Sequence, residues 1–74
     1  MAWALDPDAI AALERITEGL KAAKRTKRQG FNVQQVREIL RQAMRAFKAR
    51  DYTTATDLAN RAIQLCALST PSRF

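Results

Sequence analysis

The side chains that most often perform catalysis or bind metals are scarce in this sequence. None of its 74 residues is histidine, one is cysteine (Cys66), and the seven Asp and Glu residues form no cluster. General acid–base catalysis, nucleophilic catalysis and zinc binding depend on such groups. Neither glycine lies in a phosphate-binding motif. We therefore expect that the protein is not an enzyme and has no cofactor and no metal site.

Cys66 itself has two interpretations. On the apolar face of a helix, a cysteine acts as a small buried hydrophobic side chain, and the alternative is a reactive thiol. One cysteine cannot form an intramolecular disulfide bond, which is typical of a protein in the reducing cytoplasm. No apolar run is long enough to span a membrane, and the N-terminus lacks the basic-then-apolar order of a signal peptide. We expect a cytoplasmic protein.

Positive charge is the chemistry that the sequence does offer. The formal net charge is +6, and residues 19–50 contain ten Lys and Arg residues against one acid, Glu38. The first group of cations comprises Lys21, Lys24, Arg25, Lys27 and Arg28. Closely spaced cations raise the local potential, which attracts nucleic-acid phosphates, anionic lipid or an acidic protein. The other interpretation is a solvated helix end, which the helix dipole favours.

A second group of cations recurs at helical spacing and forms a stripe. Its members are Arg37, Arg41, Arg45 and Lys48. The stripe is either a solvated helix face or a surface for an acidic partner or nucleic acid. The first group contains no aromatic residue that could stack on bases, so single-strand recognition is not favoured. Trp3 either folds back on the core or anchors a contact with a partner.

Three segments with apolar residues at helical spacing predict an all-α, three-helix bundle with helices at about 7–29, 33–49 and 52–68. Asp6 is expected to cap the first helix and Gly30 to end it. The apolar face that is expected to pack comprises Ile10, Leu13, Ile16, Leu20 and Ala23. Lysines interrupt this face after Ala23, so residues 21–28 are expected to extend into solvent.

The second and third helices have comparable patterns. Asn32 and Gln35 form a capping-box pattern at the start of the second helix, and Asp51 can cap the third. The apolar face of the second helix comprises Val36, Ile39, Leu40, Ala43, Met44 and Phe47. That of the third comprises Tyr52, Ala55, Leu58, Ala59, Ala62, Ile63 and Cys66. We expect one domain over residues 1–74, with loose ends at 1–5 and 69–74.

Residues from about 36 to 71 resemble one tetratricopeptide repeat (TPR). The turn reads Arg50-Asp51-Tyr52 where the family often has Gly-Asp-Tyr, and alanines stand where the family has small side chains: Ala43, Ala55 and Ala62. The MIT domain, a three-helix bundle, contains a hairpin and a tyrosine turn that are similar to those of this segment. The resemblance implies an antiparallel helical hairpin whose second face needs cover, from the first helix or from another chain.

Three functions are consistent with these features. The leading hypothesis is a protein–protein interaction module, adaptor or chaperone-like, that holds an acidic or amphipathic segment of a partner. The second is sequence-independent nucleic-acid binding through both groups of cations. The third is a homo-oligomer or assembly subunit whose apolar faces meet between copies. The first two depend on the cations, and the third depends on the apolar surface.

Overall fold

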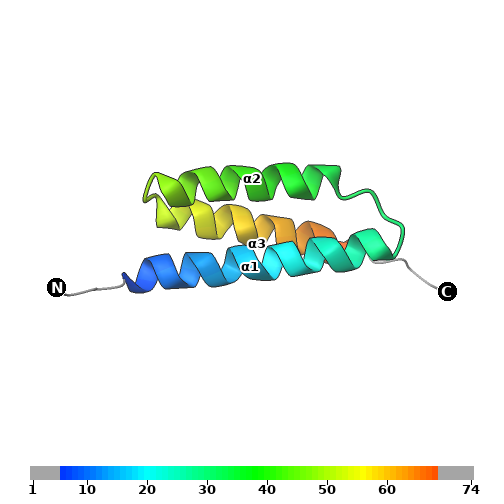
Figure 1. Ribbon diagram of the computed structural model, residues 1–74, viewed down its shortest axis with the longest axis horizontal. Helices are drawn as coiled ribbons and strands as arrows, with labels where there is room; N and C mark the ends of the chain where they lie inside the picture. Colours follow the sequence, from blue (N-terminus) through cyan, green and yellow to red (C-terminus); the bar gives the residue numbers. More distant parts are fainter. Residues whose placement is uncertain (1–5, 69–74) are drawn as a thin grey trace.

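The computed structural model describes residues 6–68, which form three helices joined by two short turns (Figure 1). The helices are α1 (Pro7–Arg28), α2 (Gln34–Lys48) and α3 (Tyr52–Leu68). They confirm the predicted all-α bundle, and no helix boundary differs from the prediction by more than one residue. The predicted loose ends, residues 1–5 and 69–74, lie outside the described residues.

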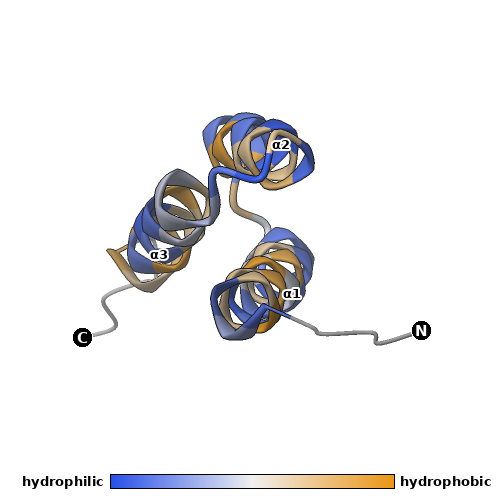
Figure 2. Cartoon of the chain, turned by 90° about the vertical axis from the view of Figure 1, so that its left-hand side faces the viewer, coloured by the Kyte–Doolittle hydropathy of each residue, from blue (hydrophilic) through white to orange (hydrophobic). Residues whose placement is uncertain are grey.

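The chain reverses its direction at each turn, so α2 is antiparallel to both α1 and α3 (Figure 1). Viewed end-on, they form a triangle (Figure 2). Helix α3 packs extensively against both other helices, whereas α1 and α2 have the least extensive contact of the three pairs. Helix α1 therefore contacts the α2–α3 hairpin mainly through α3. The junction between α1 and α2 is less closely packed.

Small side chains fill much of the centre of the bundle. One buried cluster comprises Ala12, Ile16, Ala43, Ala55 and Ala59, and another comprises Ala23, Val33, Val36, Leu40, Ala62 and Cys66. A Cβ atom added at Gly19 would lie 2.7 Å from Cδ2 of Leu40, so α1 and α2 touch where α1 has no side chain. The distance between packed helices depends on the side chains at the contact, and these residues allow a close approach.

The packed face of α1 differs from the predicted one. Ile16 and Ala23 are buried as expected, but Ile10, Leu13 and Leu20 are 43%, 49% and 48% exposed. The residues buried beside Ile16 and Ala23 are Ala12, Gly19 and Thr26. Helices that approach closely through alanine and glycine leave little room for larger side chains at the same contact. The prediction for Ile10, Leu13 and Leu20 was therefore wrong.

The C-terminal part of α1 is packed, although residues 21–28 were predicted to extend into solvent. Ala23 and Thr26 are 5% and 6% exposed. Ala23 belongs to a core cluster with Val33, which precedes α2, and Cys66, which lies near the end of α3. The cations of this segment remain exposed because they occupy the other sides of the helix.

The turn after α1 is a Schellman motif. Gly30 has a φ of 94°, a left-handed conformation that costs glycine little. Its N–H donates to the Lys27 carbonyl at 2.9 Å, and the Phe31 N–H donates to the Thr26 carbonyl at 3.3 Å. These bonds satisfy two carbonyls at the helix end and direct the chain back towards α2.

Side-chain oxygens accept backbone hydrogen bonds at the starts of α1 and α2. Asp6 Oδ1 accepts a hydrogen bond from the Asp8 N–H at 2.9 Å, as predicted. Asn32 Oδ1 accepts from the Gln34 N–H at 2.9 Å. In the described turn, Gln35 does not complete the predicted capping box, because α2 begins at Gln34 with Val33 at the cap position.

The predicted apolar faces of α2 and α3 are largely correct. The buried members are Val36, Leu40 and Ala43 on α2 and Ala55, Ala59, Ala62 and Cys66 on α3. Met44 lies at the edge of its face and is 37% exposed. The rings of Phe47 and Tyr52 meet edge-on with centroids 5.4 Å apart, which closes the α2–α3 end of the bundle.

Candidate interaction surface

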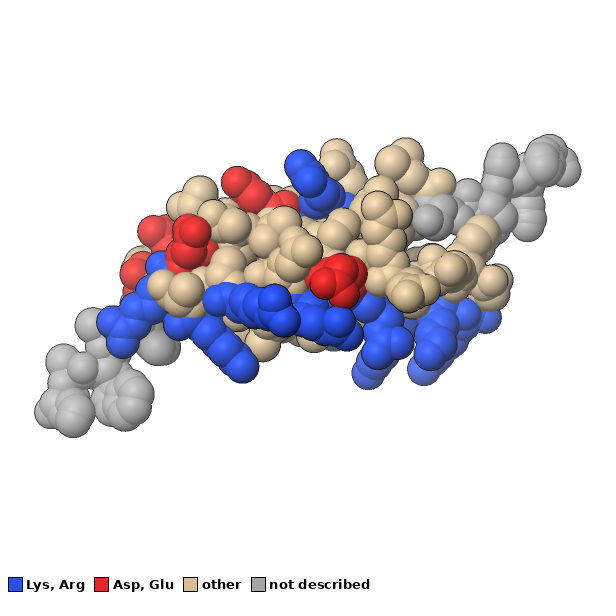
Figure 3. All heavy atoms as spheres, turned by 90° about the horizontal axis from the view of Figure 1, so that it is seen from above, with Lys and Arg blue, Asp and Glu red and all other residues tan. Residues whose placement is uncertain are grey.

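The nine cations selected from the sequence are all exposed and lie on α1 and α2. Those on α1 are Lys21, Lys24, Arg25, Lys27 and Arg28, and those on α2 are Arg37, Arg41, Arg45 and Lys48. Viewed from above, many Lys and Arg side chains gather along one long edge of the molecule, and most of the visible acidic side chains lie towards one end (Figure 3). The fold thus places two sequence-separated groups of cations on adjoining helices.

These cations are almost uncompensated. Within residues 6–68, the one ion pair that involves any of them joins Arg41 to Glu38 at 2.9 Å, and the two side chains are 59% and 55% exposed. An exposed pair of this kind contributes little to stability. Arg15, in contrast, has a structural contact. Its Nε donates a hydrogen bond to Asn60 Oδ1 at 2.7 Å, and this bond joins α1 to α3. The nine cations leave a positive surface that attracts anionic partners.

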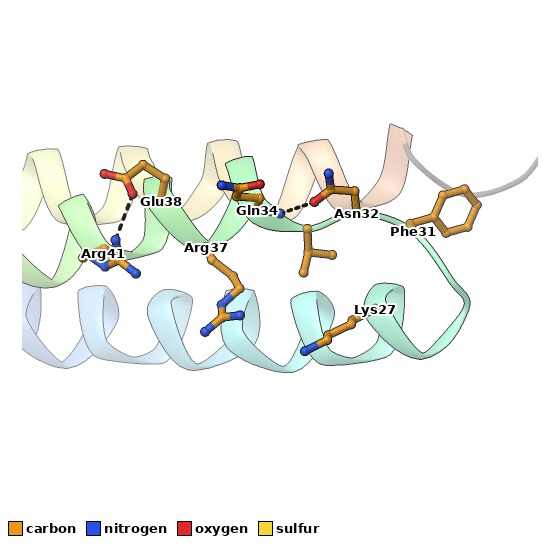
Figure 4. A pocket seen from close by; sticks show the side chains of 8 residues that line it. Lys27, Phe31, Asn32, Gln34, Arg37, Glu38 and Arg41 are labelled. Atoms are coloured by element: carbon orange, nitrogen blue, oxygen red, sulfur yellow. Dashed lines mark hydrogen bonds and ion pairs between the residues drawn. The ribbon is translucent and has the colours of Figure 1, made fainter.

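A groove lies between α1 and α2 beside the turn that joins them. One part of about 440 Å³ is lined by Lys27, Phe31, Arg37 and Arg41, among others. A second part of about 290 Å³ extends along α1 as far as Leu20 and shares Lys27 and Arg37 with the first. Figure 4 shows Arg37 reaching from α2 towards α1, with Lys27 on α1 nearby and Arg41 one turn along α2 beside Glu38.

We call this feature the cation groove and define it by Lys24, Lys27, Arg37 and Arg41, the four predicted cations that line it. Its floor is partly apolar, since Leu20, Ala23 and Val33 also line it. The five other predicted cations are exposed but do not line the groove: Lys21, Arg25, Arg28, Arg45 and Lys48. Trp3, the predicted anchor, lies outside the described residues. The groove therefore combines cations with apolar contact surface.

The sequence prediction missed the exposed apolar side chains of α1. Ile10, Leu13 and Leu20 were assigned to the core because they are large and recur at helical spacing. A second signal pointed to a different face: Ala12, Gly19 and Ala23 also recur at helical spacing. Small residues on one line of a helix permit close packing, and this line is the one that is buried.

Cys66 is a buried free thiol, 6% exposed. It packs with Leu40 and Ala62, which agrees with its interpretation as a small hydrophobic side chain. In the part of the chain that the structure describes, no helix is long and apolar enough to cross a membrane. No group of three or more metal-binding side chains occurs among the same residues.

No protein-family model, curated protein or solved structure matches this chain. The antiparallel α2–α3 hairpin is present in the structure, but the resemblance of residues 36–71 to a TPR or MIT hairpin stays a prediction. The function is therefore inferred from the surface itself.

Proposed function

We propose that this protein is a protein–protein interaction module, adaptor or chaperone-like, that binds an acidic or amphipathic segment of a partner. The observation that carries the proposal is the cation groove, where four exposed cations border an apolar floor and one of them is paired with an acid in the described structure. Cations without partners favour association with an acidic segment and speed the encounter. The apolar floor adds contact area that an amphipathic segment can cover.

Nucleic-acid binding through the same cations is the second candidate. Nucleic-acid phosphates are bound by exposed Lys and Arg side chains, and the exposed cations on α2 provide them. The apolar lining of the groove by Leu20, Ala23 and Val33 contributes nothing to phosphate binding. Phe31, the aromatic residue at the groove, is partly buried beside the turn. The mixed character of the groove favours a protein segment.

Capture of partners from host extract by immobilised protein tests the proposal. The variant Arg37→Glu reverses one charge in the groove, and Arg61→Glu makes the same change at an exposed position on α3. We expect nuclease-treated extract to yield a set of proteins that wild type and Arg61→Glu retain and that Arg37→Glu loses. The retained amounts are measured by quantitative mass spectrometry.

Two results would contradict the proposal. Equal recovery by Arg37→Glu and Arg61→Glu would show that the groove is a solvated surface. Recovery that disappears after nuclease treatment would assign the cations to nucleic acid. A labelled oligonucleotide then provides a direct check, because its affinity for wild type would fall steeply with salt concentration.

A further inference from the structure

A stripe of exposed residues follows α1 from its N-cap and lies partly outside the cation groove. In residues 6–68 the exposed large apolar side chains are Ile10, Leu13, Leu20, Met44 and Leu68. Three of these five, Ile10, Leu13 and Leu20, lie on α1. Their exposure is costly, since covering apolar surface contributes about 25 cal/mol for each Å². A clustered apolar face on one helix indicates a contact with another molecule.

The spacing of the stripe is that of a coiled-coil seam. Its members follow one another at alternating steps of four and three residues: Asp6, Ile10, Leu13, Thr17, Leu20 and Lys24. All six are exposed. Residues at such steps form one line along a helix, which a second helix can cover along its length. The stripe therefore fits a helix as its partner.

Thr17 does not break the apolar character of the stripe. Its hydroxyl donates to the Leu13 carbonyl of the same helix at 2.8 Å. Burying a hydroxyl without a hydrogen bond is costly, and this bond removes the cost. The central turns of α1 can therefore enter an interface with no unpaired side-chain donor at Thr17.

The charges on α1 indicate which helix the partner helix is. Residues 6–20 contain four acids and one cation, and residues 21–28 contain five cations and no acid. A second copy of α1 in antiparallel orientation would place each acidic half beside the other copy's basic half. A parallel copy would place like charges together. The stripe then pairs Asp6 with Lys24, Ile10 with Leu20 and Leu13 with Thr17, each pair occurring twice about a two-fold axis.

We infer that the protein forms a two-fold symmetric homodimer in which the α1 stripe of one copy packs antiparallel on the α1 stripe of the other. The same surface patch on both copies is the usual form of a closed dimer interface. One pair of helices buries less than a standard interface, so the dimer is weak, with a dissociation constant on the order of 10 µM to 1 mM.

Light scattering over that range of concentrations tests for the dimer. The wild-type mass is expected to rise from that of one chain, 8.3 kDa, towards twice that value. The variant Leu13→Ser/Leu20→Ser should shift the midpoint to roughly tenfold higher concentration or beyond. Leu68→Ser, an exposed leucine at the end of α3, is the matched control and should leave the midpoint unchanged.

Cysteine cross-linking tests the orientation, in a Cys66→Ala background so that the natural thiol does not interfere. Antiparallel pairing predicts that Ile10→Cys and Leu20→Cys proteins, oxidised as a mixture, form mainly the mixed disulfide. A disulfide needs Cα atoms about 4.4–6.8 Å apart, so distant pairs react poorly. Mass spectrometry separates the products.

A mass of one chain at the highest concentration, or an equal effect of Leu68→Ser, would overturn the dimer. Predominant 10–10 and 20–20 disulfides would overturn the antiparallel arrangement. Circular dichroism on each variant confirms that its helix content is kept, as these positions are exposed. Leu20 and Lys24 belong both to this stripe and to the lining of the cation groove. Light scattering uses the purified protein alone, so loss of the dimer and loss of partner capture are measured separately.

Discussion

Arg50 has a φ of 64°, the one positive φ at a non-glycine residue in the described chain. It occupies the turn between α2 and α3, where its N–H donates to the Phe47 carbonyl at 3.0 Å and the Asp51 N–H donates to the Ala46 carbonyl at 2.9 Å. This is the Schellman pattern, in which glycine is usual. A left-handed conformation costs an L-residue with a side chain about 1–2 kcal/mol. The turn is therefore strained at this residue.

Replacing Arg50 with glycine should stabilise the protein. We expect Arg50→Gly to raise the free energy of unfolding by about 0.5–1 kcal/mol, because the relief of strain exceeds the added entropy of the unfolded chain. Urea denaturation followed by circular dichroism measures the change. Gly30→Ala is the counterpart: Gly30 has a φ of 94°, and alanine there should lower the stability. A destabilised Arg50→Gly variant would contradict this account of the turn.

At the scale of the elements, the sequence predicts the helices well and one of their faces poorly. Helix ends depend on local signals such as Asp6, Asn32 and Gly30, which the chain supplies within a few residues. The packed face of α1 depends on how closely α2 and α3 approach it. Two lines on α1 have helical spacing, one with large side chains and one with Ala12 and Gly19. Only the packing of the whole bundle selects the second line.

The candidate site also has one part that the sequence predicts and one part that depends on tertiary packing. Periodicity placed Arg37 and Arg41 on one exposed side of their helix, and the structure agrees. The groove itself needed the turn at Gly30, which brings Lys27 of α1 beside Arg37 of α2. The relative position of two helices is a tertiary property, so residue spacing within one helix did not reveal it.

Adjacent residues on α1 provide a test of the packed face. Ala12 is 0% exposed and Leu13 is 49% exposed. We expect Ala12→Glu to destabilise the protein by about 3 kcal/mol or more, because it buries a charge in a close contact. Leu13→Glu should change the free energy of unfolding by less than about 0.5 kcal/mol in dilute solution. Thermal or urea denaturation measures both changes. If Leu13→Glu lowers the free energy of unfolding more than Ala12→Glu does, the face predicted from side-chain size is the packed one.

The whole molecule contains a natural reporter of its stability. Cys66 is 6% exposed and lies in a cluster that combines residues of all three helices, including Ala23 of α1 and Leu40 of α2. A reagent therefore reaches the thiol when these helices separate. A chain of this length has a small core and marginal stability, so such openings are frequent enough to measure.

We expect Cys66 in the native protein to react with a thiol reagent at least about a hundredfold more slowly than in urea-unfolded protein. If reaction requires global unfolding, its rate follows the unfolding equilibrium, and every 1.4 kcal/mol of stability changes it about tenfold. Arg50→Gly should then react more slowly than wild type, and Gly30→Ala should react faster. The rates are read from mass spectra over time. If neither substitution changes the reaction rate of Cys66, the end of α3 opens by itself, since a local opening there does not require either turn to unfold.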